Sequence, residues 1–351
     1  MDFRDTLEWT IPQGSVTQVT DSLNRVIWQK EQPVVLKNYF YVEDVSGSEN
    51  TLSIKKSSGS SAPTIEVYCS TDQENWVSMG TTSMTAITAT IPANSKLYLK
   101  CTADTWGIHS GATVGDNEIT CSGNYNVGGN IMSLLYGDNF ENQTTFPVNS
   151  DNNFRYLFNF NTTLISAANL EMPATTLTYQ CYRGMFRGCT SLTAAPVLPA
   201  TTLAEACYYW MFSGCSSLTT APELLTTTLA NYCYENMFYN CTALTTAPTT
   251  LPATTLVQGC YLQMFENCSV LTTAPTLPAT TLADSCYVRM FKNCTSLNEI
   301  TTYANDISAT TCLENWLDGV AARGDFYNLG GATYTSGASG IPSGWTVHTS
   351  L

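Results

Sequence analysis

A strictly periodic set of apolar pairs runs through the C-terminal half of the chain. Met-Phe recurs at steps of 26, 26, 27 and 26 residues, with a Cys-Tyr pair before it and a second Cys after it in the same register. The methionines of the five copies are Met185, Met211, Met237, Met264 and Met290. Repeats of this length stack as coils, because one unit alone cannot bury its apolar face.

The apolar positions within one unit predict a short helix followed by a short strand. From Leu203 to Cys215 apolar residues recur every four positions, which we interpret as the buried stripe of a helix. A Gly or Asn precedes the second Cys in every copy, and both residues tolerate the left-handed conformation that ends a helix. They are Gly188, Gly214, Asn240, Asn267 and Asn293. The SLTTAP stretch that follows predicts one strand per coil.

Degenerate copies at both ends of the array predict capping coils, at about residues 150–165 and 303–351. In the first, Asn161 stands where the second Cys is expected, and in the last, Trp316-Leu317 replaces Met-Phe. Terminal repeats are atypical because their outer side meets water. The pattern therefore predicts a leucine-rich-repeat solenoid over residues 138–351.

The N-terminal third predicts two further β-rich parts. Residues 1–33 hold alternating apolar runs, Leu7–Ile11, Val16–Val19 and Val26–Trp28, which predict a β-hairpin or meander that serves as an attachment segment. Short β-branched runs between turn clusters predict an immunoglobulin-like β-sandwich over residues 34–137. These runs are TLSIKKS, PTIEVYCS, ITATIP, KLYLKCTA and NEITCSG. The chain as a whole is predicted to be mainly β with short helices.

Composition and charge exclude several function classes. Asp+Glu 28 against Lys+Arg 14 gives a net charge of −14, which argues against binding to nucleic acid. Only His109 and His348 are available, too few for a multi-His zinc site. No signal peptide and no apolar run of membrane-spanning length is visible, so we expect cytoplasmic synthesis and no membrane insertion. We predict no catalytic residues, no cofactor and no metal site.

Fourteen cysteines are present, and eleven of them belong to the periodic series. In a reducing compartment free Cys behaves as a small, easily buried apolar residue. We therefore favour buried thiols, with disulfides as the alternative.

Positions that differ between copies are the candidate contact residues, because the scaffold does not dictate them. They lie between the Tyr and the Met of each unit, and we expect them on the outer face. They are Tyr209, Trp210, Glu235, Asn236, Leu262, Gln263, Val288 and Arg289. Two other surfaces stay open as sugar-binding alternatives, the ladder of Tyr residues and the Thr-rich stretches. Asp306, Glu314 and Asp318 form no recognisable catalytic pair.

The repeat unit resembles the BspA-type leucine-rich repeat, whose core reads AF-x-x-C-x-x-L. Here Met-Phe replaces Ala-Phe, and CTSL at Cys189–Leu192 and Cys294–Leu297 matches the end of that core. The resemblance covers about residues 138–351. It is closer still to Thr-rich 26-residue versions from gut Bacteroidales and their tailed phages, including crAss-like phages.

That resemblance implies an adhesive or virion-surface module rather than an enzyme. We expect a structural protein of a bacteriophage virion, fibre-like or decorating and located in the particle. The N-terminal region would bind other virion proteins, and the solenoid would bind a bacterial surface glycan or protein. A bacterial cell-surface adhesin is the alternative, and a polysaccharide-degrading enzyme is a weaker one. Homo-oligomer formation stays open.

Overall fold

The computed structural model describes residues 18–20, 26–29, 36–57, 63–101, 106, 116–147 and 151–351. This part of the chain is mainly β, with several sheets and one short α-helix, α1 (Ser133–Tyr136). The chain divides into two compact units, Met1–Lys37 and Asn38–Leu351. In the first, β1 (Gln18–Thr20) pairs antiparallel with β2 (Val26–Gln29), where a hairpin is predicted. The predicted run Leu7–Ile11 lies outside the described residues.

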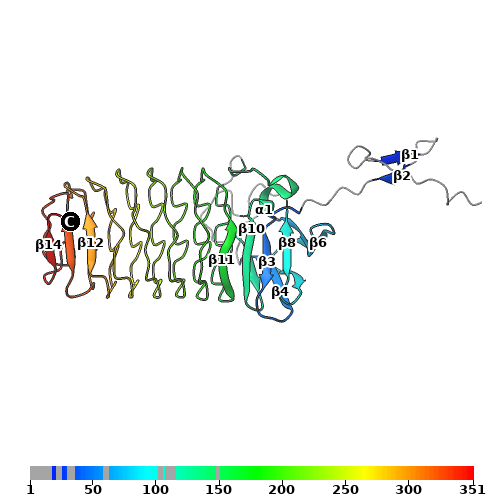
Figure 1. The fold of residues 1–351 in the computed structure, drawn as a ribbon, viewed down its shortest axis with the longest axis horizontal. Helices are drawn as coiled ribbons and strands as arrows, with labels where there is room; N and C mark the ends of the chain where they lie inside the picture. Colours follow the sequence, from blue (N-terminus) through cyan, green and yellow to red (C-terminus); the bar gives the residue numbers. More distant parts are fainter. Residues whose placement is uncertain are drawn as a thin grey trace, which may run out of the picture. The chain divides into compact units, whose positions relative to one another are not determined.

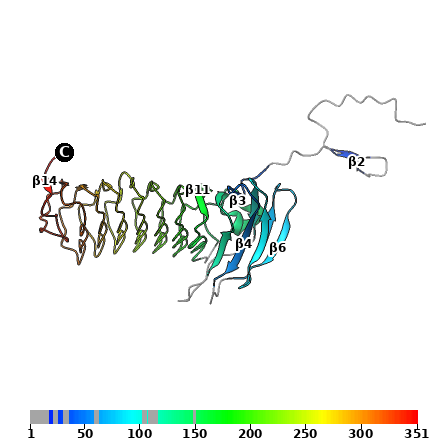
Figure 2. The ribbon, with the colours of Figure 1, turned by 90° about the horizontal axis from the view of Figure 1, so that it is seen from below.

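Residues 38–147, here named the two-sheet region, contribute strands to two sheets (Figure 2). The larger sheet has the order β11-β10-β3-β8-β5-β6, and the smaller has the order β7-β4-β9. The strands are β3 (Tyr41–Asp44), β4 (Asn50–Lys56), β5 (Glu66–Ser70), β6 (Val77–Thr81), β7 (Ile87–Ile91), β8 (Lys96–Lys100), β9 (Asn117–Cys121), β10 (Tyr125–Asn130) and β11 (Leu164–Glu171). Each of the five predicted runs contains a strand, whereas β3, β6 and β10 were not predicted. Leu52 and Ile119 of one sheet share a hydrophobic core with Val42 and Leu99 of the other.

Residues 151–351, here named the coil stack, follow as successive coils in a row (Figure 1). The Cys-Tyr-Met-Phe-Cys segment of each coil consists of consecutive tight turns, so the predicted helix in each repeat is wrong. No α-helix occurs within residues 151–351, all of which are described. Every fourth residue has a positive φ, for example Ala206 at 53°, Trp210 at 58° and Gly214 at 78°.

The physical reason for the error is the period of the apolar stripe. In an α-helix four residues turn by about 400°, so a stripe that repeats every four residues drifts around the helix axis. A backbone that itself repeats every four residues keeps the stripe pointing inward. The left-handed residue predicted before the second Cys is confirmed in all five copies.

Backbone amides in the turn segment alternate between two kinds of partner. The Tyr209 N–H donates to the carbonyl three residues earlier in its own coil, at 3.2 Å. The N–H groups of Tyr208 and Phe212 donate instead to the carbonyls of Cys233 and Met237 in the next coil, at 3.1 and 3.0 Å. Since buried backbone donors need acceptors, the segment is satisfied only when the coils are stacked.

Identical side chains form ladders inside the stack. Rings of successive Tyr residues stack with centroids 5.7–6.1 Å apart, and rings of successive Phe residues 5.5–5.7 Å apart. The inward positions predicted for Cys, Met, Phe and the Leu that follows the second Cys are 0% exposed in all five copies, whereas Leu203 at the start of the predicted stripe is half-buried. The Tyr ladder is also buried, so it cannot stack on sugars. The second Cys of each copy donates its thiol hydrogen to a Phe carbonyl of the preceding coil, as Cys215 does to Phe186 at 3.1 Å.

The sequence predicts one strand in each coil, but full strands occur only at the two ends of the stack. The central coils have single bridges, such as Thr220 with Thr246. Full strands are β11 at one end and β12 (Glu299–Thr302), β13 (Asp325–Asn328) and β14 (Thr346–His348), which pair in parallel, at the other. The turn segments, rather than a long sheet, therefore carry most hydrogen bonds between central coils.

Hydrogen bonding runs without a break from the two-sheet region into the coil stack. On one side β11 pairs in parallel with β10, and on the other side Ser166 bridges Ala194 of the next coil. Asn161 occupies the slot of the second Cys, and its Nδ2 donates to the Ile119 carbonyl in β9 at 3.2 Å. Asn replaces Cys here because this coil meets a β-strand of the two-sheet region instead of another coil.

Native protein should react with few of its thiols, and denatured protein should react at nearly all fourteen without a reductant. All fourteen cysteines are free, and all except the half-buried Cys69 are buried. Burial raises the pKa of the ladder thiols, for Cys181 and Cys241 to about 12, so the reactive thiolate is scarce. Labelling with a thiol reagent and mass spectrometry would test this, with Cys69 expected to react first. Disulfide-linked peptides from the unreduced protein would contradict it.

Candidate functional site

The eight predicted contact residues form two rows along one side of the turn segments. Trp210, Asn236, Gln263 and Arg289 occupy the middle left-handed position, with φ between 51° and 58°. Tyr209, Glu235, Leu262 and Val288 precede them. None is fully exposed, because each packs along the stack against neighbouring coils. Asn236 is buried at 6% exposure and the other seven are half-buried, so the expected outer face is a densely packed one.

Two of these residues, Tyr209 and Trp210, contact arginine side chains from the preceding coil. The Tyr209 and Trp210 rings lie 4.3 Å apart. The Arg183 guanidinium carbon lies 4.6 Å from the Tyr209 ring centroid, and that of Arg187 lies 4.3 Å from Trp210. On its other side Arg187 lies 5.3 Å from Phe160, whose side chain is 62% exposed. Phe160, Arg183, Arg187, Tyr209 and Trp210 are here named the arginine–aromatic cluster.

Sequence reasoning missed three members of this cluster, Phe160, Arg183 and Arg187. A signal was present, because Arg183 lies 26 residues before Tyr209 and therefore occupies the same row one coil earlier. Phe160 likewise lies 28 residues before Gly188 in a degenerate coil, and its ring covers the space where a Gly188 side chain would stand. Comparing the residues at equivalent positions of successive coils, rather than within one coil, would identify these contacts.

Glu235 adds a titratable group beside the cluster. Burial raises the pKa of its carboxyl from the ordinary 4.5 to about 7, although a hydrogen bond with Tyr209 and the charge of Arg183 act in the opposite direction. The Asn236 Nδ2 donates to Glu235 Oε1 at 3.3 Å. The carboxyl therefore changes charge near neutral pH.

Replacing this carboxyl should flatten the dependence of stability on pH. The folded-state pKa of Glu235, about 7, lies above its ordinary value, so the folded state holds the proton more tightly than the unfolded state. Its contribution to stability is fully present below about pH 4.5 and is lost as the pH rises through about 7. Urea denaturation at pH 5 and pH 8 should show a smaller loss of stability in Glu235→Gln than in the native protein. Glu314→Gln, an exposed position in the same row, is the control, and identical slopes in the native protein and Glu235→Gln would contradict the assignment.

The remaining predicted contacts lie further along the stack and do not join the cluster. Gln263 Nε2 donates to Glu266 Oε2 at 2.6 Å, and Leu262 and Val288 are half-buried apolar residues. The acids near the C-terminus have separate partners. Asp318 pairs with Lys292 at 3.0 Å, and Asp306 accepts a hydrogen bond from the Ser308 N–H at 3.0 Å.

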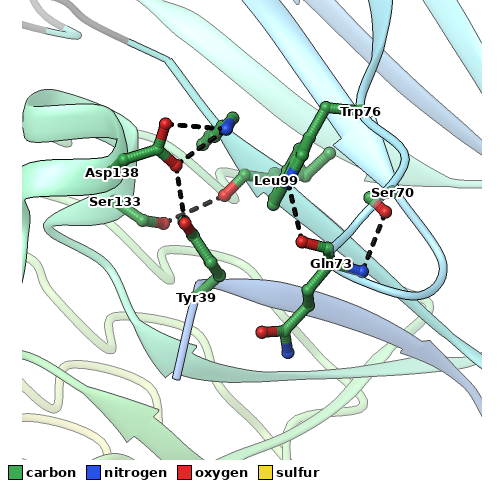
Figure 3. A network of polar contacts seen from close by, with 8 residues as sticks. Tyr39, Ser70, Gln73, Trp76, Leu99, Ser133 and Asp138 are labelled. Carbon is green, nitrogen blue, oxygen red and sulfur yellow. Dashed lines mark hydrogen bonds and ion pairs between the residues drawn. The ribbon is translucent and has the colours of Figure 1, made fainter. Parts of the chain in front are cut away.

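A second feature is a cavity of about 390 Å³ in the two-sheet region, which the sequence did not indicate. It is lined by Tyr68, Trp76, Lys100, Cys101, Tyr136, Gly137, Asp138 and Asn139. Figure 3 shows the network beside it, in which Asp138 accepts a hydrogen bond from the Tyr39 hydroxyl at 2.6 Å. Lys100 pairs with Asp138 at 2.7 Å and lies 4.1 Å over the Trp76 ring. The Trp76 indole N–H donates to the Gln73 carbonyl at 3.0 Å, which fixes the ring.

Comparisons with protein-family models, curated proteins and solved structures give no match for this chain. Among the described residues there is no group of three or more His, Cys, Asp or Glu that could hold a metal ion. No helix in that part of the chain is long and apolar enough to cross a membrane.

Proposed function

We propose that this protein is a non-enzymatic structural component of a bacteriophage virion, fibre-like or decorating, whose coil stack binds the bacterial surface. The finer fold that accompanies this proposal is a leucine-rich-repeat solenoid capped by an immunoglobulin-like sandwich. The resemblance of the repeat unit to BspA-type repeats of gut Bacteroidales and their phages supports the biological setting.

One observation carries the binding role: the interior of the stack is the same in every copy, while its lateral rows differ. The buried positions hold Cys, Tyr, Met, Phe and Cys in all five copies. The position of Trp210 becomes Asn236, Gln263 and Arg289 in the following coils. Such a scaffold can change its contacts without changing its packing. A row of weak contacts becomes strong when many copies on one particle act together.

Two measurements test this proposal. Mass spectrometry of purified phage particles should detect the chain in stoichiometric amount, and the labelled full chain should bind intact cells of some Bacteroidales strains. Detection in the bacterial envelope but not in particles would favour the cell-surface adhesin instead. Release of soluble sugar from isolated surface polysaccharide by the purified chain would favour an enzyme.

Deleting the N-terminal unit should prevent incorporation into particles without unfolding the rest. Residues 1–37 form a compact unit of their own and contain the predicted attachment segment 1–33. We therefore expect the variant lacking residues 1–37 to keep the circular dichroism of the two-sheet region and coil stack. Particles assembled in its presence should lack it, as measured by immunoblotting. Incorporation at the level of the full chain would show that attachment uses another surface.

A further inference from the structure

The two guanidinium groups of the arginine–aromatic cluster have their faces covered and their edges unused. Arg187 lies between Phe160 and Trp210, at 5.3 and 4.3 Å from the ring centroids. Arg183 lies 4.6 and 5.3 Å from the Tyr209 and Trp210 centroids. Neither guanidinium donates a hydrogen bond to, or forms an ion pair with, another described residue, and the buried Nε of Arg183 has no acceptor.

This contrasts with other cations of the same protein. Arg155 occupies the row of Arg183 one coil earlier, and its Nε pairs with Asp116 at 3.0 Å. Lys100 and Lys292 also have carboxylate partners. Arg183 and Arg187 have no carboxylate at ion-pair distance among the described residues, although the charge of Arg183 acts on the nearby Glu235. The Nε of Arg289 is also buried without an acceptor, so Arg183 and Arg187 are distinguished by their stacking on one shared set of rings. Stacking on rings fixes the planes of these two half-buried guanidinium groups.

The chemistry of the cluster fits a ring-shaped ligand that carries one anionic group. An Arg guanidinium presents paired donors that match a carboxylate or a sulfate. The 62% exposed Phe160 and the half-buried Trp210 offer apolar faces beside those donors. Nucleic acid is disfavoured because its affinity depends on many cations along the protein surface, whereas the cluster has two, beside Glu235, in a chain of net charge −14.

We propose that the arginine–aromatic cluster binds an acidic saccharide unit. The edges of Arg183 and Arg187 bind its carboxylate or sulfate, and its ring packs on Phe160 and Trp210. This inference rests on the proposed surface-binding function and names the class of ligand for the same face of the coil stack.

The test is binding of the full chain to polygalacturonate (carboxylate), dextran sulfate (sulfate) and neutral dextran, measured by calorimetry at low and moderate salt. We expect binding to at least one acidic probe and none to neutral dextran. Arg187→Gln and Arg183→Gln should each weaken it about tenfold, with Arg187→Lys less affected, because charged hydrogen bonds are lost. Arg323→Gln, an exposed position in the C-terminal cap, removes the same charge elsewhere and should change affinity less than about twofold.

Several results would overturn the inference. Equal losses of affinity in Arg187→Gln and Arg323→Gln would indicate general charge attraction. Binding to neutral dextran as tight as binding to the acidic probes would also contradict it, as would no binding to either acidic probe. Tighter binding to polyglutamate than to the acidic sugars would indicate a protein partner instead. Binding to whole cells distinguishes failure of this inference from failure of the proposed function. If the native chain and Arg187→Gln bind Bacteroidales cells equally well, this inference fails and the proposed function stands, whereas absence of cell binding removes both.

Discussion

Met237→Asp should unfold the centre of the coil stack, with a loss of unfolding free energy on the order of 4–5 kcal/mol. Met237 is 0% exposed, and its carbonyl accepts the Phe212 N–H of the preceding coil at 3.0 Å. A carboxylate there has no cation within the ladder and cannot reach water without opening two coils. Because each coil contacts only its neighbours, the damage should spread along the stack. Urea denaturation and hydrogen exchange would measure the stability and locate the opened coils.

Thr242→Asp is the matched control, because it places the same charge on an exposed turn of the same coil. It should change the unfolding free energy by no more than about 0.5 kcal/mol. Increased exchange in Met237→Asp should begin in the coils of Phe212 and Met264 and leave β5 and β8 protected. Similar losses in the two variants would show that the inward and outward faces of the turn segment are assigned wrongly.

The repeat length and the residues that face the interior of the stack were predictable, because both follow from the type of residue at each position. A buried ladder needs the same apolar residue at the same position in each coil, and five Met-Phe copies make that visible. The alternating runs of the two-sheet region were predictable for a similar reason, since β4 and β8 expose and bury residues in turn. Strand β10 was missed because it contains Gly128 and Gly129, which usually mark turns.

The local backbone of the repeats was not predicted, because apolar residues at every fourth position suit both a short α-helix and a run of four-residue turns. The evidence that separates them is the recurrence of Gly and Asn at the same four-residue interval. Gly184 and Gly188 show it in one copy, and Asn236 and Asn240 in another, all with positive φ. Such residues are unfavourable inside a helix but suited to left-handed positions. At Gly184 a side chain would also meet the Tyr156 ring, 2.2 Å from the ideal Cβ position.

The candidate site was predicted in part, and the missing part depends on stacking between coils. Tyr209 and Trp210 stood out because they differ from the equivalent residues of other copies. Arg183 and Arg187 reach them only because the preceding coil lies directly alongside. The cavity beside Trp76 and Lys100 was not predictable, since β5, β8 and the segment after α1 meet there from distant parts of the chain.

Breaking the ion pair between Arg155 and Asp116 should loosen the two-sheet region from the coil stack. Arg155 belongs to the first coil and Asp116 precedes β9, and their side chains are only 9% and 1% exposed. Arg155→Met removes the cation and leaves the carboxylate in a buried site. We expect a loss of about 3–5 kcal/mol in the free energy of unfolding. Urea denaturation followed by circular dichroism would measure it.

The double variant Arg155→Met with Asp116→Leu separates the charge effect from the effect of lost packing. A buried ion pair replaced by apolar residues of similar size often costs little, so the double variant should recover most of the stability lost in Arg155→Met. Lys292→Met is the control at a more exposed ion pair, with side chains 26% and 42% exposed, and should cost at most about 1 kcal/mol. If the double variant is no more stable than Arg155→Met, the pair contributes through shape alone. The junction would then be held by backbone hydrogen bonds such as that from the Ile119 N–H to the Leu157 carbonyl, at 2.8 Å.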